Sequence, residues 1–256
     1  MFETCPKCGY QRRPIDTGDA GICGSCGLVF AKWVQRQAGV SPARVEAPAH
    51  ARDEDEASLA SRLWQGLVYV PERTDPILLW GRVALFIAFF VWGWYFILID
   101  FRTNEIGHSF MHRVNLVFHE AGHVIFMPFG NFMMTLGGSL GQLLMPVVVM
   151  VALIWKNRDS FGASFGLWWL GQSLMDLAPY INDARDLQLM LLGGGTGEDR
   201  PGIHDWENIL LDLGLIEFDR KIAFGADALG TVLVVMALCW GAYVLYLQYR
   251  NLRTPT

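Results

Sequence analysis

The sequence predicts an all-α polytopic membrane protein with a small N-terminal metal-binding domain. Three observations carry this prediction. Apolar residues make up 52% of the 256 residues and charged residues 18%, both shifted toward the apolar side of ordinary soluble composition. Several segments hold about 20 mostly apolar residues, the length that a transmembrane helix needs. The first 38 residues are instead polar and carry four cysteines at regular spacing.

Four segments are each predicted to span the bilayer as one helix: 77–99, 132–154, 161–181 and 228–249. A further apolar segment, 114–130, gives a fifth span if it crosses fully. The positive-inside rule favours four spans with both termini on one side, whereas the metal site discussed below favours a full crossing. The expected number of transmembrane helices is therefore four to five, in an integral multi-pass protein.

The composition also predicts the domain boundaries and excludes one class of partner. Residues 39–61 hold Pro, Ala and mixed charge without aromatics, which is typical of a flexible linker. The domains are thus expected at 1–38, 39–61 and 62–256. The net charge is −5 and no basic stripe is present, so no nucleic-acid partner is expected. The polar first thirty residues do not predict a secretory signal peptide.

The N-terminal domain holds two Cys-x2-Cys pairs, each followed by glycine: Cys5 and Cys8 with Gly9, and Cys23 and Cys26 with Gly27. Four thiolates at this spacing fit one tetrahedral zinc ion, and glycine lets each turn close around the metal. A pair of disulfides is the disfavoured alternative, since nothing suggests export. The pattern resembles a zinc ribbon, which implies a structural zinc and a fold that depends on it. The ribbon is expected on the cytosolic side, where it could bind a protein partner.

The segment 114–130 contains the sequence His119-Glu120-Ala-Gly-His123 within an apolar stretch. His119 and His123 are four residues apart, so a helix presents both imidazoles on one face, where they can hold one metal ion. Glu120 then lies beside the metal and is the candidate general base of a hydrolytic zinc site. Ionisable groups at membrane depth are costly and mark a functional site by default.

This motif, the glycine-rich segment after it and a later acidic motif resemble the site-2 protease class of intramembrane metalloproteases. In that class, Asn-x-x-Pro-x-x-x-Leu-Asp-Gly supplies the third zinc ligand through its Asp. The nearest text here is Asp176-Leu-Ala-Pro-Tyr-Ile-Asn-Asp183-Ala, in which the Pro matches and the spacing to Asp is one shorter. The resemblance therefore implies Asp183 as the third ligand. Asp176 and His204 are the alternative ligands, or groups that orient the ligands.

The leading hypothesis is a peptidase with one catalytic and one structural zinc, acting on a transmembrane or membrane-proximal polypeptide. One alternative is a catalytically silent scaffold or adaptor that acts through its zinc ribbon. Another is a metal-dependent hydrolase or transporter for a small or lipid-like molecule. His108 and His112 form a second pair four residues apart, interpreted either as an interfacial pair or as a route for water or protons to the site.

Overall fold

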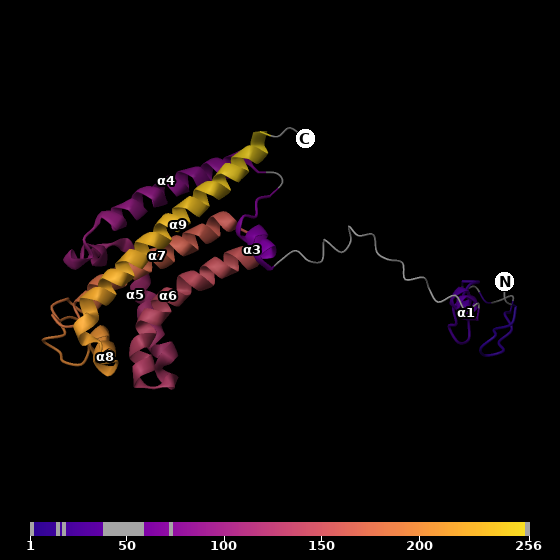
Figure 1. Ribbon diagram of the computed structural model, residues 1–256, viewed down its shortest axis with the longest axis horizontal. Coiled ribbons are helices and arrows are strands. Elements are labelled where there is room, and N and C mark those ends of the chain that lie inside the picture. The colour runs from indigo at the N-terminus through magenta and orange to yellow at the C-terminus, as the bar shows by residue number, and fades with distance from the viewer. Residues whose placement is uncertain (1–2, 14–15, 17–18, 38–58, 72–73, 254–256) are drawn as a thin grey trace. The chain divides into compact units, whose positions relative to one another are not determined.

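The computed structural model describes residues 3–13, 16, 19–37, 59–71 and 74–253. The chain divides into two compact units, Met1–Ser58 and Leu59–Thr256 (Figure 1). Most of the predicted linker, 39–61, lies outside the described residues. Its last three residues already belong to the first helix of the second unit, α3 (Leu59–Leu67).

The first unit consists of two short turns followed by α1 (Phe30–Gln37). In each turn the amide of a glycine, Gly9 or Gly27, donates to the carbonyl of the first cysteine of the pair. Both glycines have φ of 69°, a left-handed conformation that a residue without Cβ adopts at little cost. The buried side chains of Cys5, Cys23 and Phe30 form the small core of this unit.

The regular elements in the described residues of the second unit are all helices, and a loop, 183–204, joins α7 to α8. After α3 the elements are α4 (Pro76–Leu98), η1 (Phe101–Thr103), η2 (Glu105–His108), α5 (Phe110–Phe126), η3 (Met127–Phe129), α6 (Asn131–Trp155), α7 (Ser160–Asn182), α8 (Asp205–Asp212), η4 (Ile216–Phe218) and α9 (Asp219–Arg253). The starts of α4, α5, α7 and α8 are capped by side chains that accept amide hydrogens: those of Asp75, Ser109, Asp159 and His204. Such caps satisfy the free N–H groups of the first helical turn.

Among the described residues, three helices are long and apolar enough to cross a membrane: α4, α6 and the segment Ile216–Leu252, which covers nearly all of α9. They correspond to the predicted spans 77–99, 132–154 and 228–249, and they agree with the prediction of an all-α membrane protein. The other two predicted segments fall on α7 and α5. The 23 residues of α7 include a set of buried polar side chains that lower its hydropathy: Ser160, Ser164, Gln172, Ser173 and Asp176. With only 17 residues, α5 is shorter than a typical span.

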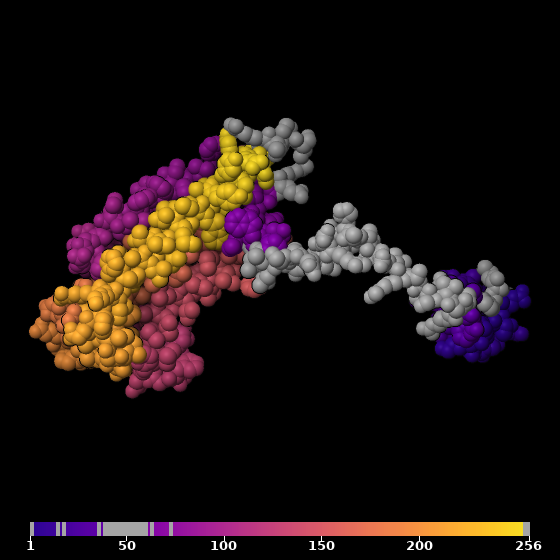
Figure 2. Space-filling model, viewed as in Figure 1, coloured from indigo at the N-terminus to yellow at the C-terminus, as the bar shows by residue number. Residues whose placement is uncertain are grey.

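The most extensive helix pair in this unit is formed by α7 and α9. A Cβ on Gly171 of α7 would come within 2.6 Å of the Gly230 carbonyl oxygen of α9, so the two backbones touch where the helices cross. Glycines allow this close approach between helices in a bilayer. The fully buried Trp168 packs beside the crossing, together with Phe96 of α4. Figure 2 shows α4 and α9 side by side on one face of the unit.

The helices α5 and α6 form the second close pair (Figure 1). A Cβ on Gly137 would lie 2.7 Å from both the Gly122 carbonyl oxygen and the Phe126 Cβ. Any larger residue at Gly137 would therefore push α6 away from the helix that carries the His-Glu-x-x-His motif. This crossing brings α6 against the imidazoles of His119 and His123.

Candidate metal centre

The His-Glu-x-x-His motif lies on α5, which begins where the Ser109 hydroxyl accepts the His112 amide hydrogen. The helix places ligand atoms of His119, Glu120 and His123 within 4.8 Å of one another. His119 is buried, at 6% exposure. The motif therefore forms a compact donor set on one turn of helix, as its spacing predicts.

A further donor comes from the first residue of α8. The Oδ2 atom of Asp205 lies 3.1 Å from His119 Nε2 and 3.3 Å from His123 Nε2. Zinc–ligand distances of about 2.0–2.2 Å in a tetrahedral site place neighbouring ligand atoms about 3.3 Å apart. Asp205 Oδ2 thus lies as far from each Nε2 atom as neighbouring ligands do around one small metal ion.

The orientation of both imidazoles is set by partners on α6. His123 Nδ1 lies 2.8 Å from the Met134 carbonyl oxygen, and His119 Nδ1 lies 3.3 Å from Oε1 of Gln142. Because a carbonyl oxygen only accepts, Nδ1 carries the hydrogen in both residues. The Nε2 atoms are then the ring atoms that face Asp205, and they are the ones available to a metal once they give up their hydrogens. In known metal sites, a hydrogen bond from the other ring nitrogen to a carbonyl or carboxylate orients the histidine in the same way.

Burial of the Asp205 carboxyl would raise its pKa. The His119 and His123 imidazoles outweigh this effect and lower the pKa of Asp205 to about 2. Tyr180 of α7 holds the same residue, because its hydroxyl accepts the Asp205 amide hydrogen at 2.9 Å and donates to Oδ2 at 3.3 Å. The Asp205 carboxylate is therefore held as an anion beside the two imidazoles, and this is the charge that a divalent cation would need there.

Space for an ion beside the imidazoles depends on a glycine of α6. A Cβ on Gly138 would lie 2.5 Å from His123 Nε2 and 2.6 Å from His119 Nε2. A zinc ion would lie only about 2.0–2.1 Å from the same two atoms. Gly138 thus leaves open the region that a bound ion would occupy, and the residues present fit a metal.

Replacing Gly138 by alanine is expected to remove the metal of this site, because the added methyl group would contact both Nε2 atoms. Gly137→Ala is the matched control, since its methyl group would disturb the same helix crossing without meeting an imidazole. Both variants should lose thermal stability, but only Gly138→Ala should lose one metal ion per chain after dialysis against a weak chelator. Equal metal content in the two variants would contradict this assignment of the ion's position.

The site opens into a cavity of 490 Å³, within the size range of small-molecule and cofactor pockets. Leu116 of α5 and the segment Leu189–Leu192 contribute apolar walls. The polar groups in its lining include His112, His119, Glu120, His123, Asp176 and Asp205. A substrate in this cavity would reach the imidazoles and the Glu120 carboxylate together.

The other predicted ligands have different partners. Asp183 lies at the end of α7, where its two oxygens accept the amide hydrogens of Gln188 and Leu189, each at 2.9 Å. His204 is fully buried and caps α8 through Nδ1, while its Nε2 lies 3.4 Å from Asp183 Oδ2. The structure therefore brings Asp205, rather than Asp183 or His204, to the two imidazoles.

Asp176 also has partners of its own, on α5 and α6. Its carboxylate accepts hydrogen bonds from the side chains of His112, Asn115 and Gln142. Asp205 was not among the ligands predicted from the sequence. A carboxylate at the start of an amphipathic helix, beside a histidine already under consideration, is the signal that could have identified it.

The first unit holds the second candidate metal group, formed by Cys5, Cys8, Cys23 and Cys26. The Sγ atoms of Cys5 and Cys26 are 3.7 Å apart, as are those of Cys8 and Cys23. A tetrahedral ion with sulfur ligands at about 2.3 Å gives about 3.8 Å between sulfurs, whereas a disulfide would need about 2.05 Å. The amide N–H of Cys26 lowers the pKa of the Cys23 thiol to about 6, which favours the thiolate that binds metal.

A relative of known function could show what these two donor sets bind. The chain matches no protein-family model, no curated protein and no solved structure. The resemblance to site-2 proteases thus rests on the sequence motifs alone, and the functional argument rests on the geometry around the motif in α5.

Proposed function

We propose that the chain is a zinc-dependent intramembrane peptidase, with zinc held by His119, His123 and Asp205. The observation that carries this proposal is the position of Asp205 Oδ2, 3.1 and 3.3 Å from the two Nε2 atoms. Two histidines and one carboxylate are a ligand set of catalytic zinc sites, which keep a fourth position open for water or substrate. The four cysteines, in contrast, would hold a closed, structural zinc.

Glu120 supplies the acid–base chemistry in this proposal. A bound zinc ion would polarise the scissile carbonyl and lower the pKa of water to about 7. The Glu120 carboxylate would take a proton from the attacking water and deliver it to the nitrogen of the leaving amine. His119, His123 and Asp205 are held by Gln142, Met134 and Tyr180, so the three ligands require little rearrangement to bind the ion.

The surroundings of the site favour a polypeptide substrate within or beside the bilayer. The motif helix α5 packs against α6, one of the three candidate spans, and the cavity combines apolar walls with the polar groups. In this proposal α5 and α7 also lie at membrane depth, giving the four to five spans expected from the sequence. The zinc ribbon would lie in the cytosol and recruit a substrate or a partner protein.

The proposal is tested with the purified full-length chain in liposomes. We expect two zinc ions per chain, and hydrolysis of some members of a panel of fluorescence-quenched peptides that contain transmembrane sequences. Chelation should stop this hydrolysis, and added zinc should restore it. One zinc per chain and no hydrolysis would instead support a scaffold acting through its ribbon. Two zinc ions with hydrolysis of esters or lipids, but not of peptides, would support the third hypothesis.

A further inference from the structure

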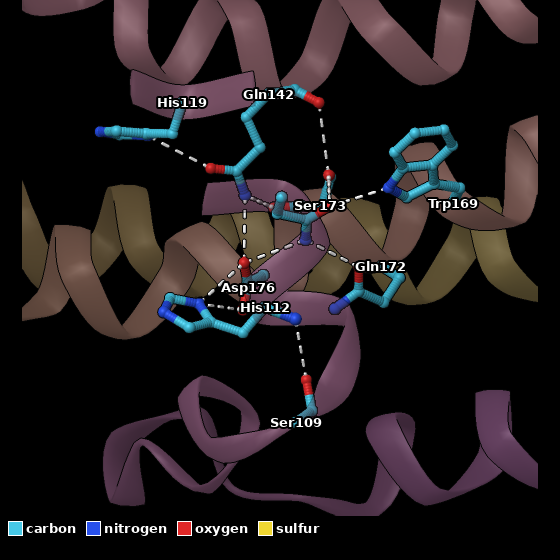
Figure 3. Close-up of polar contacts among 9 residues, drawn as sticks. Ser109, His112, His119, Gln142, Trp169, Gln172, Ser173 and Asp176 are labelled. Atoms are coloured by element: carbon cyan, nitrogen blue, oxygen red, sulfur yellow. Dashed lines mark hydrogen bonds and ion pairs between the residues drawn. The ribbon is translucent and has the colours of Figure 1, made fainter. Parts of the chain in front are cut away.

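A buried network of polar side chains joins α5, α6 and α7 next to the metal centre (Figure 3). Asp176 of α7 lies in the middle of this network. His112 Nδ1 is 3.0 Å from its Oδ1 atom, and the amides of Asn115 and Gln142 donate to its Oδ2 atom at 3.0 and 3.2 Å. Asn115 in turn accepts hydrogen bonds from Trp169 at 2.8 Å and Ser173 at 3.0 Å.

Gln142 connects this network to the first histidine of the motif. Its Nε2 atom donates to Asp176 Oδ2 and to the Ser173 carbonyl oxygen, both at 3.2 Å. Neither acceptor can donate a hydrogen bond when Asp176 is a carboxylate, so the amide group of Gln142 has one favourable orientation. In that orientation its Oε1 atom faces His119 Nδ1, as Figure 3 shows.

We propose that Gln142 and Asp176 are positioning residues for the metal, which hold His119 in the tautomer that can bind it. The Gln142 oxygen requires a hydrogen on His119 Nδ1, which leaves the lone pair on Nε2, the atom 3.1 Å from Asp205 Oδ2. Asp176 acts one step further away, because it fixes which end of the Gln142 amide faces His119. This inference rests on the metal site of the proposed function.

The tautomer argument predicts that a change of one atom at Asp176 reaches the metal. In Asp176→Asn, an NH2 group in the place of Oδ2 would face the NH2 groups of Asn115 and Gln142, which both donate to that oxygen in the wild type. A rotation of the Gln142 amide relieves the contact between two NH2 groups, but it then presents its own NH2 group to His119. His119 must accept through Nδ1 in that state, so its hydrogen moves to Nε2 and blocks the metal. The Ser173 carbonyl oxygen opposes this rotation, because it would lose its donor. We therefore expect the metal to bind more weakly, but not to be lost completely.

The experiment titrates full-length protein with Co²⁺, which substitutes for zinc and reports ligand geometry through its visible absorption. The cysteine site gives thiolate-to-cobalt absorption and serves as an internal reference in each variant. Asp176→Asn and Gln142→Leu should each weaken Co²⁺ binding at the histidine site about 10–100-fold, the usual effect of losing a partner of a metal ligand. Binding at the cysteine site should not change.

The double variant Gln142→Glu with Asp176→Asn provides the rescue. The new carboxylate at 142 accepts from His119 Nδ1 and also from the new NH2 group at 176, so the connection is rebuilt with the carboxylate and amide exchanged. We expect Co²⁺ affinity to rise above that of Asp176→Asn and to stay below that of the wild type, because the Ser173 carbonyl oxygen then faces a carboxylate and no longer a donor.

Trp169→Phe is the matched control, because Trp169 donates to Asn115 on the branch of the network that leads away from His119. This variant should lose thermal stability and keep both Co²⁺ affinity and spectrum. The inference is overturned if the Asp176 and Gln142 variants keep wild-type affinity, or if Trp169→Phe weakens metal binding as much as they do. If the wild type itself binds no second metal, the proposed function fails and this inference fails with it.

Discussion

Glu120→Gln is expected to lower peptide hydrolysis by about 10²–10⁴-fold, the usual contribution of general acid–base catalysis. Glutamine keeps the size of the side chain but cannot take a proton from water. The metal should remain bound, because its proposed ligands are His119, His123 and Asp205. The measurement is the initial rate of cleavage of a quenched transmembrane peptide in liposomes, together with the zinc content of the same preparation.

Glu105→Gln is the control for this variant. Glu105 is an exposed residue of η2, and the same chemical change there should leave the rate unaltered. Full activity of Glu120→Gln would rule out the proposed role of the carboxylate. A loss of zinc together with activity would show that Glu120 binds or supports the metal rather than moving a proton.

Asp205→Ala is expected to lower zinc affinity at the histidine site by more than the ~10–100-fold typical of residues that only support a ligand. The reason is the approach of its Oδ2 atom to both Nε2 atoms. Asp205→Asn should also weaken binding, because it removes the negative charge while keeping the shape of the side chain. Metal content after dialysis against a graded series of weak chelators measures the loss.

Asp183→Ala tests which residue is the third metal ligand: Asp205, which the geometry indicates, or Asp183, which the sequence alignment implies. Its oxygens accept the amide hydrogens of Gln188 and Leu189, so the variant should lose about 1–3 kcal/mol of folding free energy from unpaired amides. It should still retain the metal. If Asp183→Ala loses the metal and Asp205→Ala keeps it, the alignment to the site-2 protease motif holds and Asp205 is not a ligand.

The helices most readily predicted from the sequence are those whose outer faces are apolar. The predicted spans 77–99, 132–154 and 228–249 coincide with helices that meet the criteria of length and hydropathy, because continuous apolar runs are a local signal. The segment 161–181 is also a helix, α7. More of its residues are buried than in the other predicted spans, and its buried polar side chains point into the helix bundle. Hydropathy along one segment does not indicate which polar residues find partners on other helices.

The sequence by itself determined the two donor groups whose members are close along the chain. The Cys-x2-Cys pairs and the His-Glu-x-x-His motif depend on turn and helix geometry, which local spacing fixes. Only the tertiary structure decided the rest of the metal centre: Asp205 from α8, and Gln142 and Gly138 from α6. These residues come together because glycines let α6 pack closely on α5 and because Tyr180 of α7 holds the start of α8. Such contacts depend on how whole helices pack, and no spacing within one segment encodes them.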